Sequence, residues 1–122
     1  MPHGERGSMS GDLEDLISRI NSFRDDRDWR QFHNPKDLAL SVVLEASELL
    51  ELFQWRSAEQ VVESRSQGLR DEIADVLIYT LMLADDLGFD PADLVRDKLR
   101  LNAQKYPVDR SRGTNVKYSD LR

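Results

Sequence analysis

The segment LEASELLELFQW, residues 44–55, decides how the rest of the chain is interpreted. Its leucines and phenylalanine predict a buried helix, yet three glutamates interrupt the apolar run. Residues advance about 100° per position around a helix, so with Glu45 at zero, Glu48 falls near 300° and Trp55 near 280°. These three side chains are therefore predicted to share one stripe. Glu51, near 240°, lies at the margin of that stripe, and we expect it to face solvent.

A second pair of acids with the same spacing follows in DEIADVLIYTLML, residues 71–83. With Glu72 at zero, Asp75 falls near 300° and Tyr79 near 340°, so an aromatic ring again follows the acids on one face. Acids usually face water, and we expect this of Asp71. The residues that flank Glu72 and Asp75 are apolar and leave little polar helix face. Full exposure to water is therefore less favoured for this pair than for Asp71.

Convergence of the two pairs predicts a cation site. Ionised carboxylates at close range repel, so at least one of them holds a proton unless a cation is present. An all-oxygen ligand set selects hard ions, Mg²⁺ or Mn²⁺ before Zn²⁺. The spacing alone leaves solvated acids equally open, because E-x-x-E is common on exposed helices. A di-iron site with Glu-x-x-His pairs is disfavoured, since neither His3 nor His33 follows a glutamate by three.

The remaining sequence predicts an all-α fold of the four-helix-bundle type. Apolar periodicity and helix-end signals place four helices at about residues 12–27, 35–56, 69–88 and 91–106. Asp12 is the expected N-cap of the first, and Pro35 and Pro91 suit first helical turns. The second and third helices are apolar on nearly all sides. One subunit offers too few neighbours to cover them, so we expect a homo-oligomer, a dimer or a tetramer built as a dimer of dimers.

The ends and connections of the chain are less regular. We exclude residues 1–11 from the fold as a disordered segment or cloning junction. Residues 57–68 predict one or two helical turns plus a linker. We assign residues 12–122 to a single domain whose tail becomes irregular from about residue 107.

Composition excludes several classes of protein. The 122 residues include 17 basic and 23 acidic side chains, a net charge of −6. Sequence-independent binding of nucleic acid needs a basic face, so we expect no nucleic-acid polymer as partner. The absence of cysteine excludes thiolate metal sites and thiol nucleophiles, and it fits a cytoplasmic protein. No apolar run approaches the roughly 20 residues of a membrane span, so we expect no membrane association.

The last predicted helix carries a polar stripe. Lys98, Asn102 and Lys105 lie at about 0°, 40° and 340° on it. Two ammonium groups and an amide can hold phosphate oxygens. By itself such a stripe is more often an ordinary exposed face. Beside a carboxylate–metal cluster the phosphate interpretation gains weight, because a metal–polyphosphate site needs both charges.

Aromatic side chains suggest a base pocket. Trp29 and Phe32 lie in a polar loop with His33, while Trp55 is expected at a helix end and Tyr79 beside the second acid pair. Large rings are most often core or interface residues. Rings in polar surroundings also suit a pocket that stacks on a nucleotide base, and we assign these five residues to such a pocket.

Several segments together resemble the MazG-like, all-α nucleoside triphosphate pyrophosphohydrolase superfamily. The hallmark E-x-x-E, gap, E-x-x-D of that superfamily is matched by Glu45-Ala-Ser-Glu48 and Glu72-Ile-Ala-Asp75. The likeness extends over about residues 13–121 and is greatest to the dCTP pyrophosphatase branch, in the segments RDWRQFHNPKDL, ELFQW, DVLIY, KLRLNAQKYP and YPVDRSRGTNVKYSDL.

The resemblance implies a site and a reaction. It implies that Mg²⁺ binds the four acids of the hallmark, which form the catalytic centre, with Mn²⁺ as a possible substitute. It implies hydrolysis of a nucleoside triphosphate to the monophosphate and pyrophosphate. It also implies subunits assembled as dimers or dimers of dimers. The expected phosphate contacts are Lys98, Asn102, Lys105 and Tyr106.

Two other functions stay open on the sequence. A helical metal- or nucleotide-sensing or oligomerisation module would have the same fold without turnover. A relative preferring dUTP or dUDP would use the same chemistry on another base. Release of pyrophosphate from dCTP separates an enzyme from the non-catalytic module, and a panel of substrates addresses the preferred base.

Overall fold

The structure is a computed structural model that describes residues 8–121. Of the segment 1–11 that we exclude from the fold on its sequence, residues 1–7 lie outside the described residues, and the expectation is wrong for residues 8–11, because they form the first turn of a helix. The described part contains helices and no strand, which confirms the all-α prediction. In chain order the helices are α1 (Ser8–Asp26), α2 (Pro35–Glu51), α3 (Ala58–Ser64), α4 (Ser66–Asp86), α5 (Pro91–Lys105) and α6 (Val108–Ser111), with 3₁₀ turns at Arg30–Phe32 and Tyr118–Asp120.

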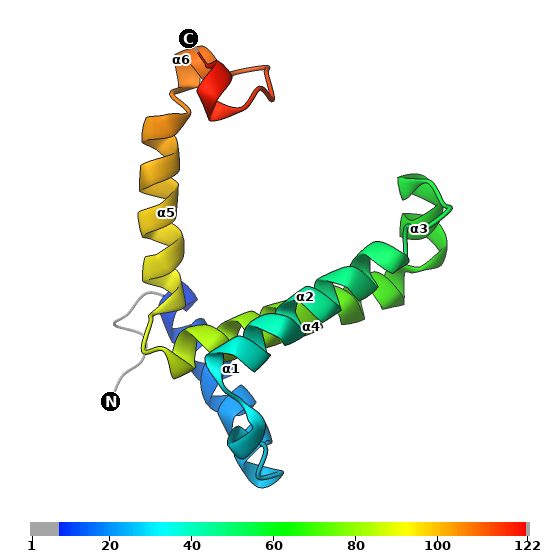
Figure 1. Cartoon of the computed structure of the whole chain (residues 1–122), viewed down its shortest axis with the longest axis vertical. Helices are drawn as coiled ribbons and strands as arrows, with labels where there is room; N and C mark the ends of the chain where they lie inside the picture. Colours follow the sequence, from blue (N-terminus) through cyan, green and yellow to red (C-terminus); the bar gives the residue numbers. More distant parts are fainter. Residues whose placement is uncertain (1–7, 122) are drawn as a thin grey trace. The chain divides into compact units, whose positions relative to one another are not determined.

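The chain divides into two compact units, one up to Phe89 and one from Asp90 onward. In the first unit α2 and α4 lie side by side and run in opposite directions, while α1 and α3 also pack on α4 (Figure 1). Leu38 of α2 and Val61 of α3 are completely buried, and Met82 and Ala84 of α4 are nearly so. This antiparallel pairing brings the middle of α2 opposite the middle of α4.

Side-chain caps explain where the helices of this unit begin. Asn34 accepts a hydrogen bond from the Asp37 backbone N–H at 2.9 Å, and Pro35 opens α2 as expected. Ser57 and Gln60 form a reciprocal capping box at the start of α3, with bonds of 2.8 and 3.2 Å. The prediction for Asp12 is wrong, because α1 begins at Ser8 and Asp12 lies inside it.

The end of α2 differs from the sequence prediction. The helix stops at Glu51 and not near Arg56. Beyond it the backbone N–H of Phe53 bonds to the Leu50 carbonyl at 2.9 Å, and that of Arg56 to the Phe53 carbonyl at 3.0 Å. These three-residue steps tighten the chain into a turn, and the Ser57 capping box then starts a new helix. The chain can turn here because its local hydrogen bonds are satisfied without an α-helix.

The second unit contains α5 and the tail. Asp90 accepts a hydrogen bond from the Ala92 N–H at 2.9 Å and Pro91 begins the helix, as predicted. The expectation of an irregular tail is partly wrong, because α6 and a 3₁₀ turn lie within it. The Tyr118 ring contacts the Tyr106 ring edge-on, with centroids 6.2 Å apart, and so fastens the tail to the end of α5.

Much apolar surface remains exposed on the isolated chain. Leu50 is 71% exposed, and other large apolar side chains of α2 and α4 are more than two-fifths exposed, namely Leu40, Val43, Leu44, Ile73 and Leu77. Many exposed apolar side chains on two neighbouring helices are typical of interaction surfaces. Within the described residues, no helix combines the length and the apolar character needed to cross a membrane.

Candidate active site

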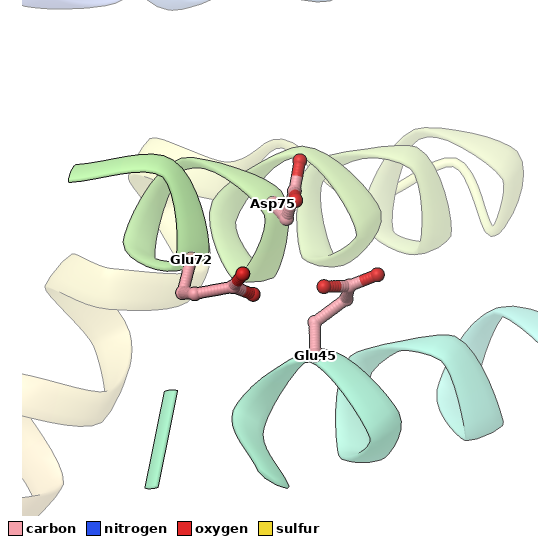
Figure 2. Close-up of side chains that lie close together, drawn as sticks. All are labelled: Glu45, Glu72 and Asp75. Carbon is pink, nitrogen blue, oxygen red and sulfur yellow. The ribbon is translucent and has the colours of Figure 1, made fainter. Parts of the chain in front are cut away.

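Three acids from two helices converge where α2 and α4 face each other. Glu45 projects from α2 toward Glu72 and Asp75 of α4 (Figure 2). One carboxylate oxygen from each lies within 4.8 Å of the others, and all three side chains are half-buried. The periodicity argument is therefore confirmed for these three positions. We call them the acid cluster.

The acid cluster has the electrostatics of a site that needs a cation. A hydrogen bond with Glu48 is the largest of the causes that raise the pKa of Glu45 to about 7, followed by burial and by the neighbouring negative charges. Burial is the main cause that raises the pKa of Glu72. One buried oxygen of Glu45 and one of Glu72 have no hydrogen-bond partner among the described residues. Unpaired, buried carboxylate oxygens facing one another are suited to a hard divalent cation.

Glu48 belongs to the same neighbourhood but not to the closest group. It is exposed, and it is not one of the three acids whose oxygens lie within 4.8 Å. Its hydrogen bond and charge nevertheless act on both Glu45 and Glu72. Of the four predicted ligands, the structure thus groups three tightly and places the fourth at their edge.

Tyr79 lies beside the acids, one helical turn beyond Asp75. Burial is the first cause that raises its pKa, and the charges of Glu45, Asp75 and Glu48 raise it further. A phenol so close to the acids stays protonated and keeps its hydrogen-bond donor. The assignment of Tyr79 to a base pocket stays a prediction.

Trp55 does not lie on the helical stripe of Glu45, and that prediction is wrong because α2 ends four residues earlier. Trp55 has a left-handed φ of +64° in the turn after α2, and its side chain is 94% exposed. A bulky residue in this conformation is a true outlier, and such strain clusters at ligand-binding positions. The unusual backbone presents the indole to solvent at the end of the helix that carries Glu45.

Trp29 and Phe32 lie in the loop between α1 and α2. The Trp29 ring packs edge-on against Phe23, with centroids 5.6 Å apart, and the Arg27 guanidinium lies 3.7 Å from the centre of the Phe23 ring. Phe32 is 65% exposed. Trp29 is thus held by α1, while Phe32 remains available to a ligand or to a second subunit.

His33 joins a buried polar group that the sequence prediction missed. Its Nδ1 lies 3.3 Å from a guanidinium nitrogen of Arg24, which is fully buried and ion-paired with Asp86 at 2.9 Å. A signal for this group existed in the sequence. Arg24 follows Ile17 by seven residues and Ile20 by four, so it lies on the apolar stripe of its helix where an unpaired charge would be costly.

The predicted phosphate contacts lie in the second unit. Lys98 and Lys105 are exposed and Asn102 is half-buried on α5. The Lys105 ammonium lies 5.9 Å from the centre of the Tyr118 ring, in the tail that packs on Tyr106. The assignment of these residues to a triphosphate stays a prediction.

Comparison with known proteins identifies the family. Residues 40–121 match the MazG-like family, and the chain belongs to it. The chain is 40% identical to dCTP pyrophosphatase 1 of Mus musculus over 121 residues, which are 95% of this chain and 71% of that protein. It is 38% identical to dCTP pyrophosphatase 1 of Homo sapiens over 114 residues, covering 89% of this chain and 67% of the relative.

A solved structure agrees with this membership. The crystal structure of a pyrophosphatase from Archaeoglobus fulgidus is similar with a TM-score of 0.74 and 44% sequence identity, covering 78% of this chain and 92% of that one. At that identity the likeness concerns sequence as well as fold.

Proposed function

We propose that the protein hydrolyses dCTP, or a closely related modified pyrimidine triphosphate, to the monophosphate and pyrophosphate in a Mg²⁺-dependent reaction. The enzyme class, a nucleoside triphosphate pyrophosphatase, follows from membership of the MazG-like family and from relatives called dCTP pyrophosphatase. The base and the metal are the proposed parts.

The observation that carries the proposal is the acid cluster. Three half-buried carboxylates with oxygens within 4.8 Å of one another, two of them bearing unpartnered oxygens, create a strong local negative charge. A triphosphate is repelled by such a site unless a cation separates the two charges. The all-oxygen ligand set favours Mg²⁺, which when bound supplies neutralisation of charge on the phosphate oxygens.

Other side chains of the protein supply the remaining parts of the proposed reaction. Glu48, exposed and hydrogen-bonded to Glu45, is the acid we assign to orienting the attacking water and accepting its proton. Lys98, Asn102 and Lys105, with Tyr106, bind the triphosphate oxygens. The aromatic rings of Trp29 and Trp55 stack on the base. No side chain needs to act as a nucleophile, which agrees with a cysteine-free chain.

Assembly of several subunits is a further part of the proposal. The exposed apolar faces of α2 and α4, which include Leu44 and Leu50, support a dimer or a tetramer. Sedimentation equilibrium of the wild-type protein tests this. A monomer at micromolar concentration would contradict it.

A panel of substrates tests the proposed activity and its alternatives. Pyrophosphate release is measured with dCTP, 5-methyl-dCTP, dUTP, dUDP and ATP, each with and without Mg²⁺. We expect dCTP or its 5-modified form to have the highest kcat/KM. Preference for dUTP or dUDP would replace the proposed base. No release from any of them would favour the non-catalytic sensing or oligomerisation module.

Mg²⁺ is expected to stabilise the nucleotide-free protein against heat. A ligand that binds only the folded state at 100 times its Kd adds about 2.7 kcal/mol to the free energy of unfolding. The measurement is Tm by calorimetry with increasing MgCl₂, and NaCl of equal ionic strength is the control. The double variant Glu45→Gln/Glu72→Gln should lose the Mg²⁺-dependent increase. The same increase in that variant would place the metal elsewhere.

Replacing Trp55 with alanine should raise KM for dCTP by about 10-fold, because stacking on a base contributes roughly 1–3 kcal/mol. The exposed indole supports little of the fold, so kcat and Tm should change little. Steady-state kinetics with dCTP and with inorganic tripolyphosphate, which has no base, distinguish the two roles. An equal loss with both substrates would argue for a role in subunit packing.

A further inference from the structure

Arg24 lies at the centre of a buried polar cluster separate from the acid cluster. Its two terminal nitrogens bind the two oxygens of Asp86 at 2.9 and 3.0 Å, which is the bidentate geometry of a strong ion pair. One of them also donates to the Asn21 side-chain oxygen at 2.6 Å, and the other lies 3.3 Å from Nδ1 of His33. The side chain is completely buried.

This arrangement joins three parts of the first unit. Arg24 belongs to α1, Asp86 ends α4, and His33 belongs to the loop between α1 and α2. Asn21 also reaches α4, because its amide nitrogen donates to Asp85 at 2.9 Å. A guanidinium that is buried and bridges three segments fixes their mutual position more strictly than an apolar side chain, since its hydrogen bonds are directional.

The loop is fastened at both ends by the same residue. The backbone N–H of Trp29 donates to the Arg24 carbonyl at 2.9 Å, while the Arg24 side chain meets His33 four residues later. Trp29 stands at the first of these points and the exposed Phe32 lies between them, and both are assigned to the base together with His33. The position of that part of the base pocket therefore depends on Arg24.

The contact also decides which nitrogen of His33 carries the proton. An arginine has only donors, so Nδ1 of His33 must offer its lone pair, and the neutral ring then carries its proton on Nε2. Burial, followed by the charge of Arg24, lowers the pKa of His33, which keeps the ring neutral near pH 7. Among the described residues, none accepts a hydrogen bond from Nε2.

We propose that Arg24 is a positioning residue that holds His33 as an Nε2–H donor toward an acceptor atom on the edge of the nucleotide base. Trp29 and Phe32 supply stacking from the same loop, and His33 supplies the hydrogen bond that reads the edge. The inference rests on the proposed function, since it needs a nucleotide base in this pocket. Cytosine offers ring-nitrogen and carbonyl acceptors there, so a pyrimidine with a free acceptor is the ligand class that fits.

Amide replacements of His33 test the donor. The side-chain nitrogen of glutamine can stand where Nε2 stands, and that of asparagine where Nδ1 stands. We expect His33→Gln to stay within about 3-fold of wild-type KM for dCTP and His33→Asn to raise KM by about 10-fold or more, with kcat little changed, as for one lost hydrogen bond to a ligand. Equal KM values for the two variants would overturn the inference.

The tautomer test needs no turnover. In a His3→Gln background the chain has one histidine, and ¹⁵N chemical shifts of its ring report which nitrogen carries the proton. We expect the Nε2–H form in this parent. Adding Arg24→Met/Asp86→Leu to the His3→Gln protein exchanges the ion pair for apolar side chains. This variant should give a mixture of His33 tautomers and a higher KM for dCTP. The parent carrying Arg19→Met, an exposed arginine of the same helix, is the control. An Nδ1–H parent, or no change in the double variant, would overturn the inference.

The two kinds of failure are distinguishable. Wild-type protein that releases no pyrophosphate from any triphosphate overturns the proposed function before any variant is compared. If the wild-type protein is active but His33 carries its proton on Nδ1, or if His33→Gln and His33→Asn have equal KM values, only the role of Arg24 and His33 is overturned.

Discussion

Replacing Asp75 with asparagine is expected to lower kcat/KM for dCTP by about 10³-fold, with the fold intact. The substitution keeps the size of the side chain but removes a negative charge from a group of three carboxylates within 4.8 Å. A neutral amide is a poor ligand for Mg²⁺ compared with a carboxylate. Because the Asp75 side chain is only half-buried, we expect the loss of kcat/KM to come from weaker cation binding more than from disturbed packing of α4. Pyrophosphate release over a range of MgCl₂ concentrations measures it.

Two exposed acids nearby provide matched controls. Glu51→Gln on α2 and Asp71→Asn on α4 each remove one negative charge outside the acid cluster. Both should keep kcat/KM within about 3-fold, since exposed charges are well screened by water and salt. An Asp75→Asn enzyme as active as these controls would refute the metal assignment.

The second large effect concerns stability. Arg24→Met should reduce the free energy of unfolding by about 3–5 kcal/mol, because it leaves the Asp86 carboxylate without its buried partner. Urea denaturation followed by circular dichroism measures the loss. The double variant Arg24→Met/Asp86→Leu should recover much of it, since exchanging both partners for apolar side chains leaves no unpaired charge. If the double variant were as unstable as the single one, the ion pair would not be the cause.

The same ion pair predicts how stability depends on pH. The hydrogen bond from Arg24 is the main cause that lowers the pKa of Asp86 below its ordinary value of 3.8. The carboxylate therefore stabilises the fold fully above that value, and this contribution is lost as the pH falls below it. The difference in unfolding free energy between wild type and Asp86→Asn should begin to shrink at about pH 5 and keep shrinking as the pH falls through 3.8 and below. A difference that grows on acidification would contradict the assignment.

The acid cluster could be predicted from the sequence because helical periodicity is a local property. Glu45, Glu72 and Asp75 each lie well inside a helix, so an advance of about 100° per residue placed them on the right faces. Their apolar flanks gave a reason to expect them between helices and not in water. The structure confirms that interpretation and adds that Glu48 stands at the edge of the group.

Trp55 was misplaced because the end of a helix depends on competing local hydrogen bonds. The turn after Glu51 and the Ser57 capping box replace the last helical turn that apolar periodicity predicted. Arg24 was missed for a different reason. Its partner, Asp86, lies 62 residues later in the chain, and helix periodicity carries no information on contacts over such a separation. For Lys98 and Lys105 the phosphate assignment stays a prediction, because helix periodicity does not identify a ligand.

The most direct test of the central claim is the identity of the products formed from dCTP with and without Mg²⁺. Chromatography of the reaction should show dCMP and pyrophosphate in equal amounts when Mg²⁺ is present, and neither in its absence. Formation of dCDP and inorganic phosphate, or the same rate of pyrophosphate release in the presence of a chelator, would contradict a Mg²⁺-dependent pyrophosphohydrolase built on Glu45, Glu72 and Asp75.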